Sequence, residues 1–215
     1  MDTVAKMSGV QKLKRDFSGT IFARVRKYQL KLISAIPTFR TYLLAKLMGI
    51  KVEKGVRFFG MPILRRAPFG VIKIGRKCTF RSDRISNLIG INRPCLLDAH
   101  RPNAIIEIGE KSGFSGTVIA ASEKIVIGKN VKCGANSTIT DFDWHWVDPK
   151  RRDENGSKSS PVYIEDNVWL GLNAIVLKGV RIGENSIITP NSVVVKDIPA
   201  NVIAGGNPCK VIKEL

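Results

Sequence analysis

The chain has few histidines, no paired cysteine motif and no long apolar run, and each shortage argues against a class of protein. Its 215 residues include 2 histidines and 4 cysteines, and no two cysteines form a CxxC pair, so no zinc site is expected. No apolar run approaches the roughly 18 residues that cross a bilayer. The N-terminus also lacks the apolar core of a secretory signal. We therefore expect a cytoplasmic protein with reduced, buried cysteines.

Acidic side chains are also scarce, and the resulting charge is unevenly distributed. Lys and Arg number 35 against 18 Asp and Glu, which gives a net charge of +17 and first suggests a nucleic-acid partner. Residues 1–50 carry ten basic and two acidic side chains, a net charge of +8, so the charge is densest there. A hydrophobic content of 44% is that of an ordinary globular protein. The sequence thus predicts a folded chain with a basic N-terminal segment.

That segment, residues 1–50, has the periodicity of amphipathic helices. Pro37 is expected to end a first helix, and Phe39 to Gly49 would form a second, shorter one. Two interpretations stay open: a helical cap with a solvated basic face, or a segment that lies peripherally on a membrane surface. The apolar positions recur every three or four residues at Leu13, Phe17, Ile21, Val25, Tyr28, Leu32 and Ile36.

A six-residue repeat organises the rest of the chain. From Ile164 it reads IEDNVW, LGLNAI, VLKGVR, IGENSI, ITPNSV and VVKDIP, with an aliphatic first residue in every hexad. Neither a helix nor a hairpin has this period, and a β-sandwich would alternate without a fixed one. A short strand plus a tight turn fits, so that three hexads make one triangular coil. The turns would use positive φ angles at Gly75, Gly109, Gly128, Asn130, Asn167, Gly183 and Asn185.

The C-terminal repeats closely resemble the hexapeptide-repeat acyltransferases, in the branch of maltose, galactoside and polysaccharide O-acetyltransferases. The similarity is carried by VWLGLNAIVLKGVRIG and NSVVVKDIPANVIAGGNPCKVIKEL within residues 164–215. It implies a mainly β fold, a left-handed parallel β-helix, with acetyl-CoA as the donor and a homotrimer whose active sites lie between subunits. We expect the helical segment at 1–50, the β-helix at 51–199 and a C-terminal tail at 200–215. A solenoid exposes its core at an open end, which favours a cap for residues 1–50.

One large interruption of the repeat predicts a projecting loop at 140–163, and that loop contains His145. Imidazole exchanges a proton near neutral pH, and functional residues often lie on loops held by a rigid scaffold. The resemblance implies that His145 is the general base in a direct acetyl transfer. Asp143, or less favourably Asp141, could orient its ring, although both carboxylates could equally only cap the loop.

The resemblance also assigns the donor site. Trp169 would flank the pantetheine arm, and the main chain near Gly171 and Leu172 would supply the oxyanion donor. Basic side chains near the C-terminus, which would meet the phosphates of CoA, are Lys196, Lys210 and Lys213. No metal is expected, because the zinc of the γ-class carbonic anhydrases, which share the fold, needs three histidines.

The acceptor side departs from the simple sugar acetyltransferases. Their Asn-Phe-Asn-like element is replaced by Gly113, Phe114 and Ser115, which argues against a simple maltose or galactoside acceptor. The basic N-terminus and the stretch FFGMPILRRAPFGVIKIG instead resemble the branch that modifies surface polysaccharide precursors, which are often lipid-linked. This resemblance implies a sugar hydroxyl of a surface polysaccharide or its precursor as the acceptor. The alternatives are N-acetylation of a nucleotide-linked amino sugar and a silent scaffold or nucleic-acid binder, although the chain shows no RNA-binding motif. Arginines that could meet an acidic glycan or a pyrophosphate, or simply be solvated, are Arg65, Arg66, Arg81, Arg84, Arg93 and Arg101.

Overall fold

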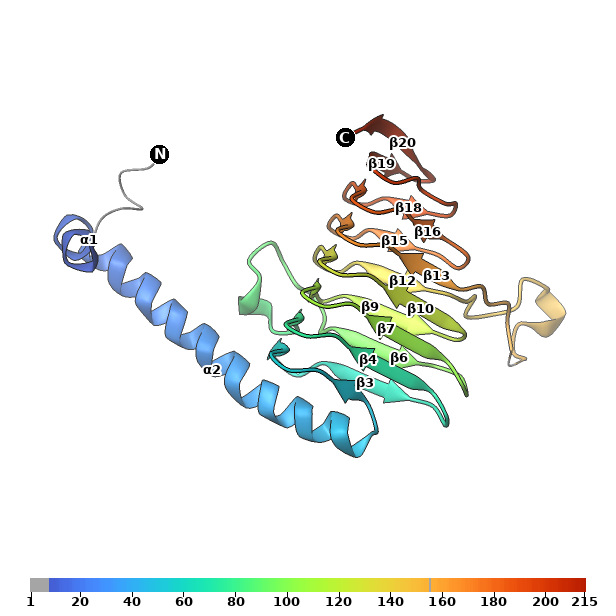
Figure 1. The fold of residues 1–215 in the computed structure, drawn as a ribbon, viewed down its shortest axis with the longest axis horizontal. Helices are drawn as coiled ribbons and strands as arrows, with labels where there is room; N and C mark the ends of the chain where they lie inside the picture. Colours follow the sequence, from blue (N-terminus) through green and yellow to red (C-terminus); the bar gives the residue numbers. More distant parts are fainter. Residues whose placement is uncertain (1–7, 155) are drawn as a thin grey trace.

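The computed structural model describes residues 8–154 and 156–215; the N-terminal part of the predicted cap, residues 1–7, lies outside them. The chain winds into a triangular prism of stacked coils, and a long helix leads into its first coil (Figure 1). Two helices, α1 (Gly9–Arg15) and α2 (Phe17–Leu47), precede the strands. None of the helices described has the length and apolar character needed to span a membrane.

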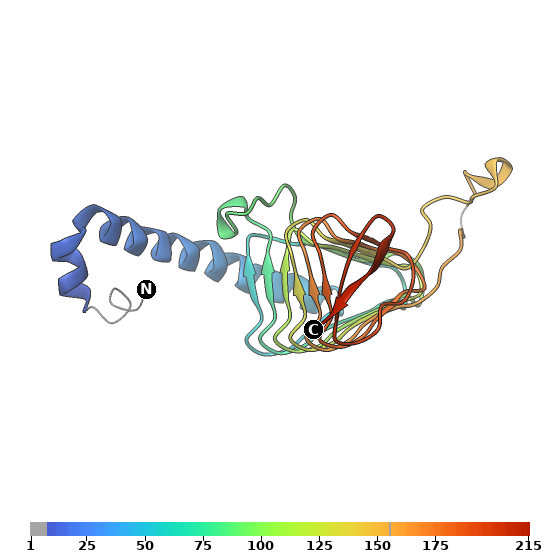
Figure 2. The ribbon, with the colours of Figure 1, turned by 90° about the horizontal axis from the view of Figure 1, so that it is seen from above.

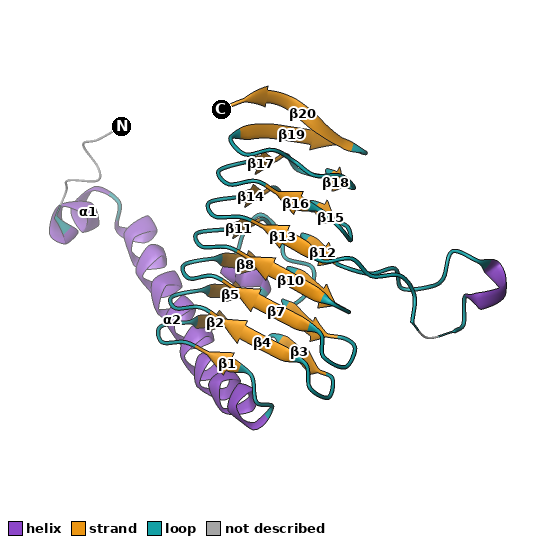
Figure 3. Cartoon of the chain, turned by 45° about the vertical axis from the view of Figure 1, so that its right-hand side comes forward, coloured by secondary structure: helices purple, strands orange, loops and turns teal. Residues whose placement is uncertain are grey.

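The prism has three sheets, one per side, and successive coils stack along its axis (Figure 3). Their strands pair in parallel, apart from the last pair of the second sheet, which is antiparallel. The first sheet contains β1 (Lys51–Val52), β4 (Val71–Ile74), β7 (Ile105–Ile108), β10 (Lys124–Ile127), β13 (Val162–Ile164) and β16 (Arg181–Ile182). The second contains β2 (Arg57–Phe59), β5 (Thr79–Arg81), β8 (Gly113–Ser115), β11 (Lys132–Cys133), β14 (Trp169–Leu170), β17 (Ile187–Ile188), β19 (Val202–Gly206) and β20 (Cys209–Glu214). The third contains β3 (Ile63–Arg66), β6 (Leu96–Ala99), β9 (Val118–Ala121), β12 (Thr138–Thr140), β15 (Ile175–Val176) and β18 (Val193–Val194).

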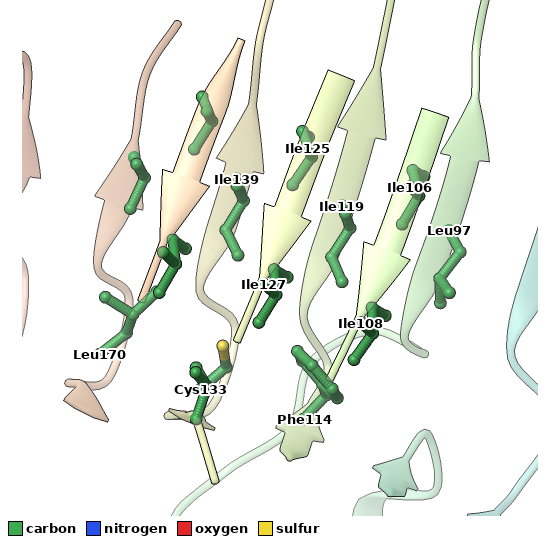
Figure 4. Close-up of a cluster of buried hydrophobic side chains, with 14 of the residues drawn as sticks. Leu97, Ile106, Ile108, Phe114, Ile119, Ile125, Ile127, Cys133, Ile139 and Leu170 are labelled. Carbon is green, nitrogen blue, oxygen red and sulfur yellow. The ribbon is translucent and has the colours of Figure 1, made fainter. Parts of the chain in front are cut away.

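The core is the column of inward side chains that the repeat predicts. Every hexad begins with a residue that is at most 1% exposed: Ile164, Leu170, Val176, Ile182, Ile188 and Val194. Toward the N-terminus the column changes from aliphatic to aromatic. The rings of Phe58, Phe80 and Phe114 stack on successive coils at centroid distances of 5.1 and 4.8 Å. Figure 4 shows Phe114, Cys133 and Leu170 on successive coils of this column.

Asparagine and glycine have different roles at the corners of the coils, which corrects the prediction that both supply positive φ angles. Asn130, Asn167 and Asn185 do have positive φ, between 55° and 62°, but the predicted glycines do not. The glycines are needed for space: a Cβ on Gly109 would lie 2.5 Å from the carbonyl carbon of Gly128 in the next coil. Small size and left-handed backbone are thus separate requirements, met at neighbouring positions of each turn.

Helix α2 continues through Pro37, so the prediction that this proline ends a helix is wrong. Proline has no N–H, which leaves the carbonyl of Ile33 without its partner inside the helix. The N–H of Gly60 donates to that carbonyl at 2.9 Å, so the first coil replaces the missing bond. Thr41 and Ala45 are buried against the coil. The C-terminal part of α2 therefore covers the open end of the prism.

Two segments leave the coils, where the sequence indicated one. The predicted excursion spans residues 141–161, between β12 and β13, and projects far from the prism (Figure 2). A second one, residues 82–95, lies between β5 and β6 and holds a short 3-10 helix (Arg84–Ser86). Arg93 fastens it by donating to the carbonyls of Gly116 and Asn136. Residues 82–95 do not follow the six-residue pattern, so the repeat does not predict that this segment leaves the coils.

Candidate active site

A cleft of about 510 Å³ runs along the second sheet and brings together the predicted donor residues Trp169, Gly171 and Leu172. The indole of Trp169 is 53% exposed, and Pro190 lies at the same end of the cleft. Further toward the N-terminus the cleft reaches Ser115, in the element that replaces the Asn-Phe-Asn motif. Donor and acceptor candidates thus share one continuous surface.

The main chain at this corner offers one free donor. The N–H of Gly171 is already used, because it donates to the carbonyl of Ile188 at 2.7 Å. The N–H of the next residue, Leu172, has no acceptor in the described part of the chain. A Cβ on Gly171 would lie 2.6 Å from the nitrogen of Pro190, so glycine is needed to hold the corner. Of the two predicted oxyanion donors, Leu172 is thus the one whose N–H is left available.

The long excursion is built as a narrow ribbon with a fixed base. Phe142 and Ser159 form an antiparallel bridge, and Arg101 donates to the carbonyl and the hydroxyl of Ser157 at 2.8 and 2.9 Å. The N–H of Asp143 donates to the carbonyl of Lys158 at 3.0 Å. These bonds hold the base of the loop while its tip stands in solvent (Figure 2).

His145 lies exposed on this loop, and one hydrogen bond indicates which of its ring nitrogens carries a proton. Its Nδ1 is 3.0 Å from the carbonyl oxygen of Arg152. A carbonyl only accepts hydrogen bonds, so Nδ1 carries the proton and Nε2 is left as the basic nitrogen. The ring is thus arranged to accept a proton at Nε2.

Asp143 and Asp141, the two aspartates that could orient His145, hydrogen-bond to other groups. Asp143 Oδ1 accepts from Lys178 Nζ at 2.5 Å, so the structure does not bring its carboxylate to His145. Asp141 is fully buried and accepts from the N–H groups of three residues at 2.6–2.9 Å: Ser122, Glu123 and Lys124. Burial raises the pKa of the Asp141 carboxyl, and these three hydrogen bonds oppose the rise. Asp141 is accordingly a structural cap of the turn before β10.

The loop and the cleft lie apart within one chain. None of the described residues between 141 and 161 lines the cleft that holds Trp169. The loop leaves at the corner after the third sheet, whereas the cleft lies at the corner after the second. A single chain therefore holds both halves of the predicted site without joining them.

The basic residues of the cleft differ from those predicted. Lys196, Lys210 and Lys213 are exposed near the C-terminal end of the prism, and none of the three lines the cleft. Lys210 and Lys213 lie on β20, the last strand of the second sheet. The basic side chains that do line the cleft are Arg57, Arg81, Lys111 and Lys132. Of these four, only Arg81 is a candidate from the sequence. The six-residue repeat does not by itself show along which side of the prism a cleft forms.

His100 belongs to a second pocket, of about 470 Å³, at the base of the loop. Its Nδ1 is 2.9 Å from Asp98 Oδ2, and its ring stacks on Phe142 at 5.0 Å. Trp144 and Arg65 also line this pocket. Within residues 8–154 and 156–215 no group of three or more His, Cys, Asp or Glu side chains could hold a metal ion.

Comparison with known proteins agrees with the repeat. Residues 161–196 match the model of the bacterial transferase hexapeptide family (six repeats). A galactoside O-acetyltransferase of Lactococcus lactis is 45% identical over 107 residues, which cover 50% of this chain and 51% of that protein. A 2,3,4,5-tetrahydropyridine-2,6-dicarboxylate N-acetyltransferase of Staphylococcus aureus strain Newman is 40% identical over 86 residues, 40% of this chain and 31% of that protein. The matches thus span about half, or less, of these relatives.

Solved structures extend the likeness of fold over the whole chain. A galactoside acetyltransferase in complex with coenzyme A matches 97% of this chain and 92% of its own, with 22% identity and a TM-score of 0.55. An N-acyltransferase from Bacillus cereus in complex with dTDP and 3-hydroxybutyryl-CoA matches 80% and 87%, with 16% identity and a TM-score of 0.56. The predicted fold, a left-handed parallel β-helix with an N-terminal helical segment, is confirmed. The family match thus assigns the hexapeptide transferase repeat to residues 161–196, while the solved structures show the fold of the chain.

Proposed function

We propose that the protein is an acetyl-CoA-dependent O-acetyltransferase that acts on a sugar hydroxyl of a surface polysaccharide or its precursor. The observation that carries the proposal is the cleft in which Trp169 flanks the unpaired N–H of Leu172. The chain's 45% identity to a galactoside O-acetyltransferase over 107 residues supports the same chemistry. The coenzyme A in the similar solved structure supports the donor.

In this proposal the chain's own residues perform four tasks. Nε2 of His145 takes the proton from the acceptor hydroxyl as the hydroxyl oxygen attacks the thioester carbonyl. The same nitrogen returns the proton to the CoA sulfur when the C–S bond breaks and CoA leaves as the thiol. The N–H of Leu172 donates to the oxygen of that carbonyl as negative charge develops on it. Asp143, paired with Lys178, positions the loop that carries His145. Lys196, Lys210 and Lys213 attract the phosphates of CoA from the C-terminal end.

The separation of loop and cleft supports a homotrimer. His145 stands on a projecting loop, and the cleft is open in a single chain. We propose that a neighbouring subunit brings its loop to this cleft, so that each of the three sites uses two chains. The catalytic base and the donor site would then meet only in the assembly.

The central test is His145→Ala. The variant should keep the mass of the wild-type oligomer and its affinity for CoA, measured by titration calorimetry, because the hydrogen bond of the ring, to the carbonyl of Arg152, lies within its own loop. Acetyl transfer should fall by about 10²–10⁴-fold, the usual contribution of a general base. Lys150→Gln, in the same exposed loop, is the matched control and should be as active as wild type. Undiminished transfer by His145→Ala would exclude the mechanism.

The acceptor class is tested by comparing hydroxyl and amine acceptors directly. We expect acetyl-CoA turnover with hexosides and oligosaccharides to give O-acetyl products, and we expect no N-acetyl product from nucleotide-linked amino sugars. Faster turnover of the amines would replace the proposal by N-acetylation. Loss of all turnover would favour a silent scaffold.

We further propose that α2 lies on an anionic membrane surface. Its outer face carries apolar side chains that are at least 44% exposed, at Phe22, Val25, Tyr28, Leu32, Ile36, Phe39, Leu43 and Leu47. The helix of 31 residues contains six basic side chains and no acidic one. A second copy of such a helix would repel it, whereas anionic head groups complement it.

Vesicle sedimentation tests this surface. Wild-type protein should pellet with phosphatidylglycerol vesicles at moderate salt and not with neutral phosphatidylcholine vesicles. Replacing Phe22, Leu32 and Phe39 together by Gln should abolish pelleting, because it removes the apolar face but keeps the charge. If the triple variant instead changes the mass of the oligomer, the face is a subunit interface. That result would overturn the membrane proposal.

A further inference from the structure

The N-terminal part of the cleft is strongly and one-sidedly basic. Its lining includes four basic side chains, and among the described lining residues none is acidic. A cation-lined cleft of this kind concentrates anions. The four residues, called here the basic quartet, are Arg57, Arg81, Lys111 and Lys132.

Acidic side chains of the described chain neutralise almost none of the positive charge of the quartet. Arg57 and Arg81 both lie over the ring of Phe59, with guanidinium carbons 5.8 and 4.7 Å from its centroid. In the described chain neither arginine, nor Lys132, forms an ion pair. Lys111 reaches only Glu110, at 3.9 Å. Burial, and then the neighbouring charge of Arg57, lower the pKa of Arg81.

The position of the quartet separates it from the predicted donor lysines. The second sheet runs in the order β2, β5, β8, β11, β14, β17, β19, β20. Arg81 on β5 is three strands from Trp169 on β14, about 14 Å at the usual spacing of strands. Lys213 on β20 lies three strands from Trp169 in the opposite direction. Cations therefore flank the reaction centre on both sides.

From this arrangement we infer that the basic quartet binds a phosphate or diphosphate group on the acceptor, next to the sugar that is acetylated. The inference rests on the proposed function, since it takes the C-terminal lysines for CoA and leaves the quartet for the acceptor. The distance to Trp169 exceeds one sugar ring, which leaves room for the acetylated sugar and an anion at its C1 between the reacting hydroxyl and Arg81. Guanidinium groups bind phosphate oxygens in pairs, and a diphosphate matches several cations better than one carboxylate does.

Acceptor kinetics provide the first test, with one hexose in four forms: free, as the 1-phosphate, as a nucleoside diphosphate and as a short-chain polyprenyl diphosphate. Phosphorylated forms should have a KM at least about tenfold lower than the free sugar, the effect of one charge-assisted hydrogen bond. The two diphosphates distinguish a nucleotide from a lipid carrier. Equal KM values for the free and phosphorylated sugars would overturn the inference while leaving acetyl transfer established.

Variants of the quartet provide the second test. Arg57→Gln and Lys111→Gln change exposed side chains and should raise the KM for the phosphorylated acceptors about tenfold. The KM for acetyl-CoA should not change. Arg76→Gln removes the same charge from an exposed site outside the cleft and should behave as wild type. A raised KM for acetyl-CoA in the quartet variants would assign these cations to the donor and overturn the inference.

A binding measurement separates this inference from the proposed function. Inorganic pyrophosphate should bind to the full-length protein in the presence of saturating CoA, and Arg57→Gln should weaken that binding about tenfold. Binding that CoA abolishes, or that Arg57→Gln does not alter, would overturn the inference. If no sugar is acetylated but Arg57-dependent binding persists, the proposed function fails and the anion site stands.

Discussion

Single residues at the coil corners have narrow and separate tasks. Asn185 adopts a φ of 62°, and its side chain bonds Asn167 on one side and Asn201 on the other, at 3.0 and 2.8 Å. These asparagines tolerate the left-handed backbone and link successive coils. Gly183, two positions earlier in the same turn, has no room for a Cβ, which would lie 2.4 Å from the nitrogen of Ala200. The hexad is thus constrained at the corner as strictly as in the core.

The cysteines give a prediction at the residue scale. All four are buried and unpaired, and burial raises the pKa of Cys78 to about 11. Because the thiolate is the reactive form, native Cys78 should be nearly inert to a thiol reagent at pH 8. We expect slow labelling of native protein and rapid labelling of four thiols after denaturation. Fast native labelling of Cys78, mapped by mass spectrometry, would show that its coil opens; Cys209, 7% exposed, is the internal comparison.

Elements are stabilised here by contacts between coils more than by their own sequence. Most strands of the C-terminal coils have only two residues, too few to persist alone, and each gains its bonds from the coils above and below. Helix α2 shows the same dependence, since its passage through Pro37 relies on the N–H of Gly60. Close stacking is therefore the main structural constraint.

Two glycine substitutions test that constraint. Gly109→Ala should lower the free energy of unfolding by about 1–3 kcal/mol, because its Cβ would lie 2.5 Å from backbone atoms of the next coil. Gly113→Ala is the control: its Cβ would contact only the side chain of Lys132, at 3.8 Å. Thermal unfolding monitored by circular dichroism measures both. Equal midpoints for the two variants would show that the stack adjusts easily.

At the scale of the whole molecule the two halves of the site are distant within one chain. The loop of residues 141–161, which bears His145, projects away from the prism (Figure 2). The cleft with Trp169 lies at another corner. The shared site that we propose would make assembly a condition of activity.

Complementation between two inactive variants tests the sharing. His145→Ala and Trp169→Ala, each strongly impaired alone, should regain activity when co-assembled, because some sites then combine an intact loop with an intact cleft. Random mixing in equal amounts gives about a quarter of such sites. Activity no higher than that of the separate variants would place each complete site within one chain.

The sequence by itself determined the repeat, the inward residues and the loop that carries His145, because a six-residue period leaves little freedom in how a coil is built. It also indicated Trp169, Gly171 and Leu172 through a local motif. It could not show that the N–H of Leu172 is unpaired while that of Gly171 is used. Nor could it place Arg57 and Lys132 in one cleft, or carry a helix through Pro37. Those features depend on which residues of different coils become neighbours, and only the tertiary structure decides that.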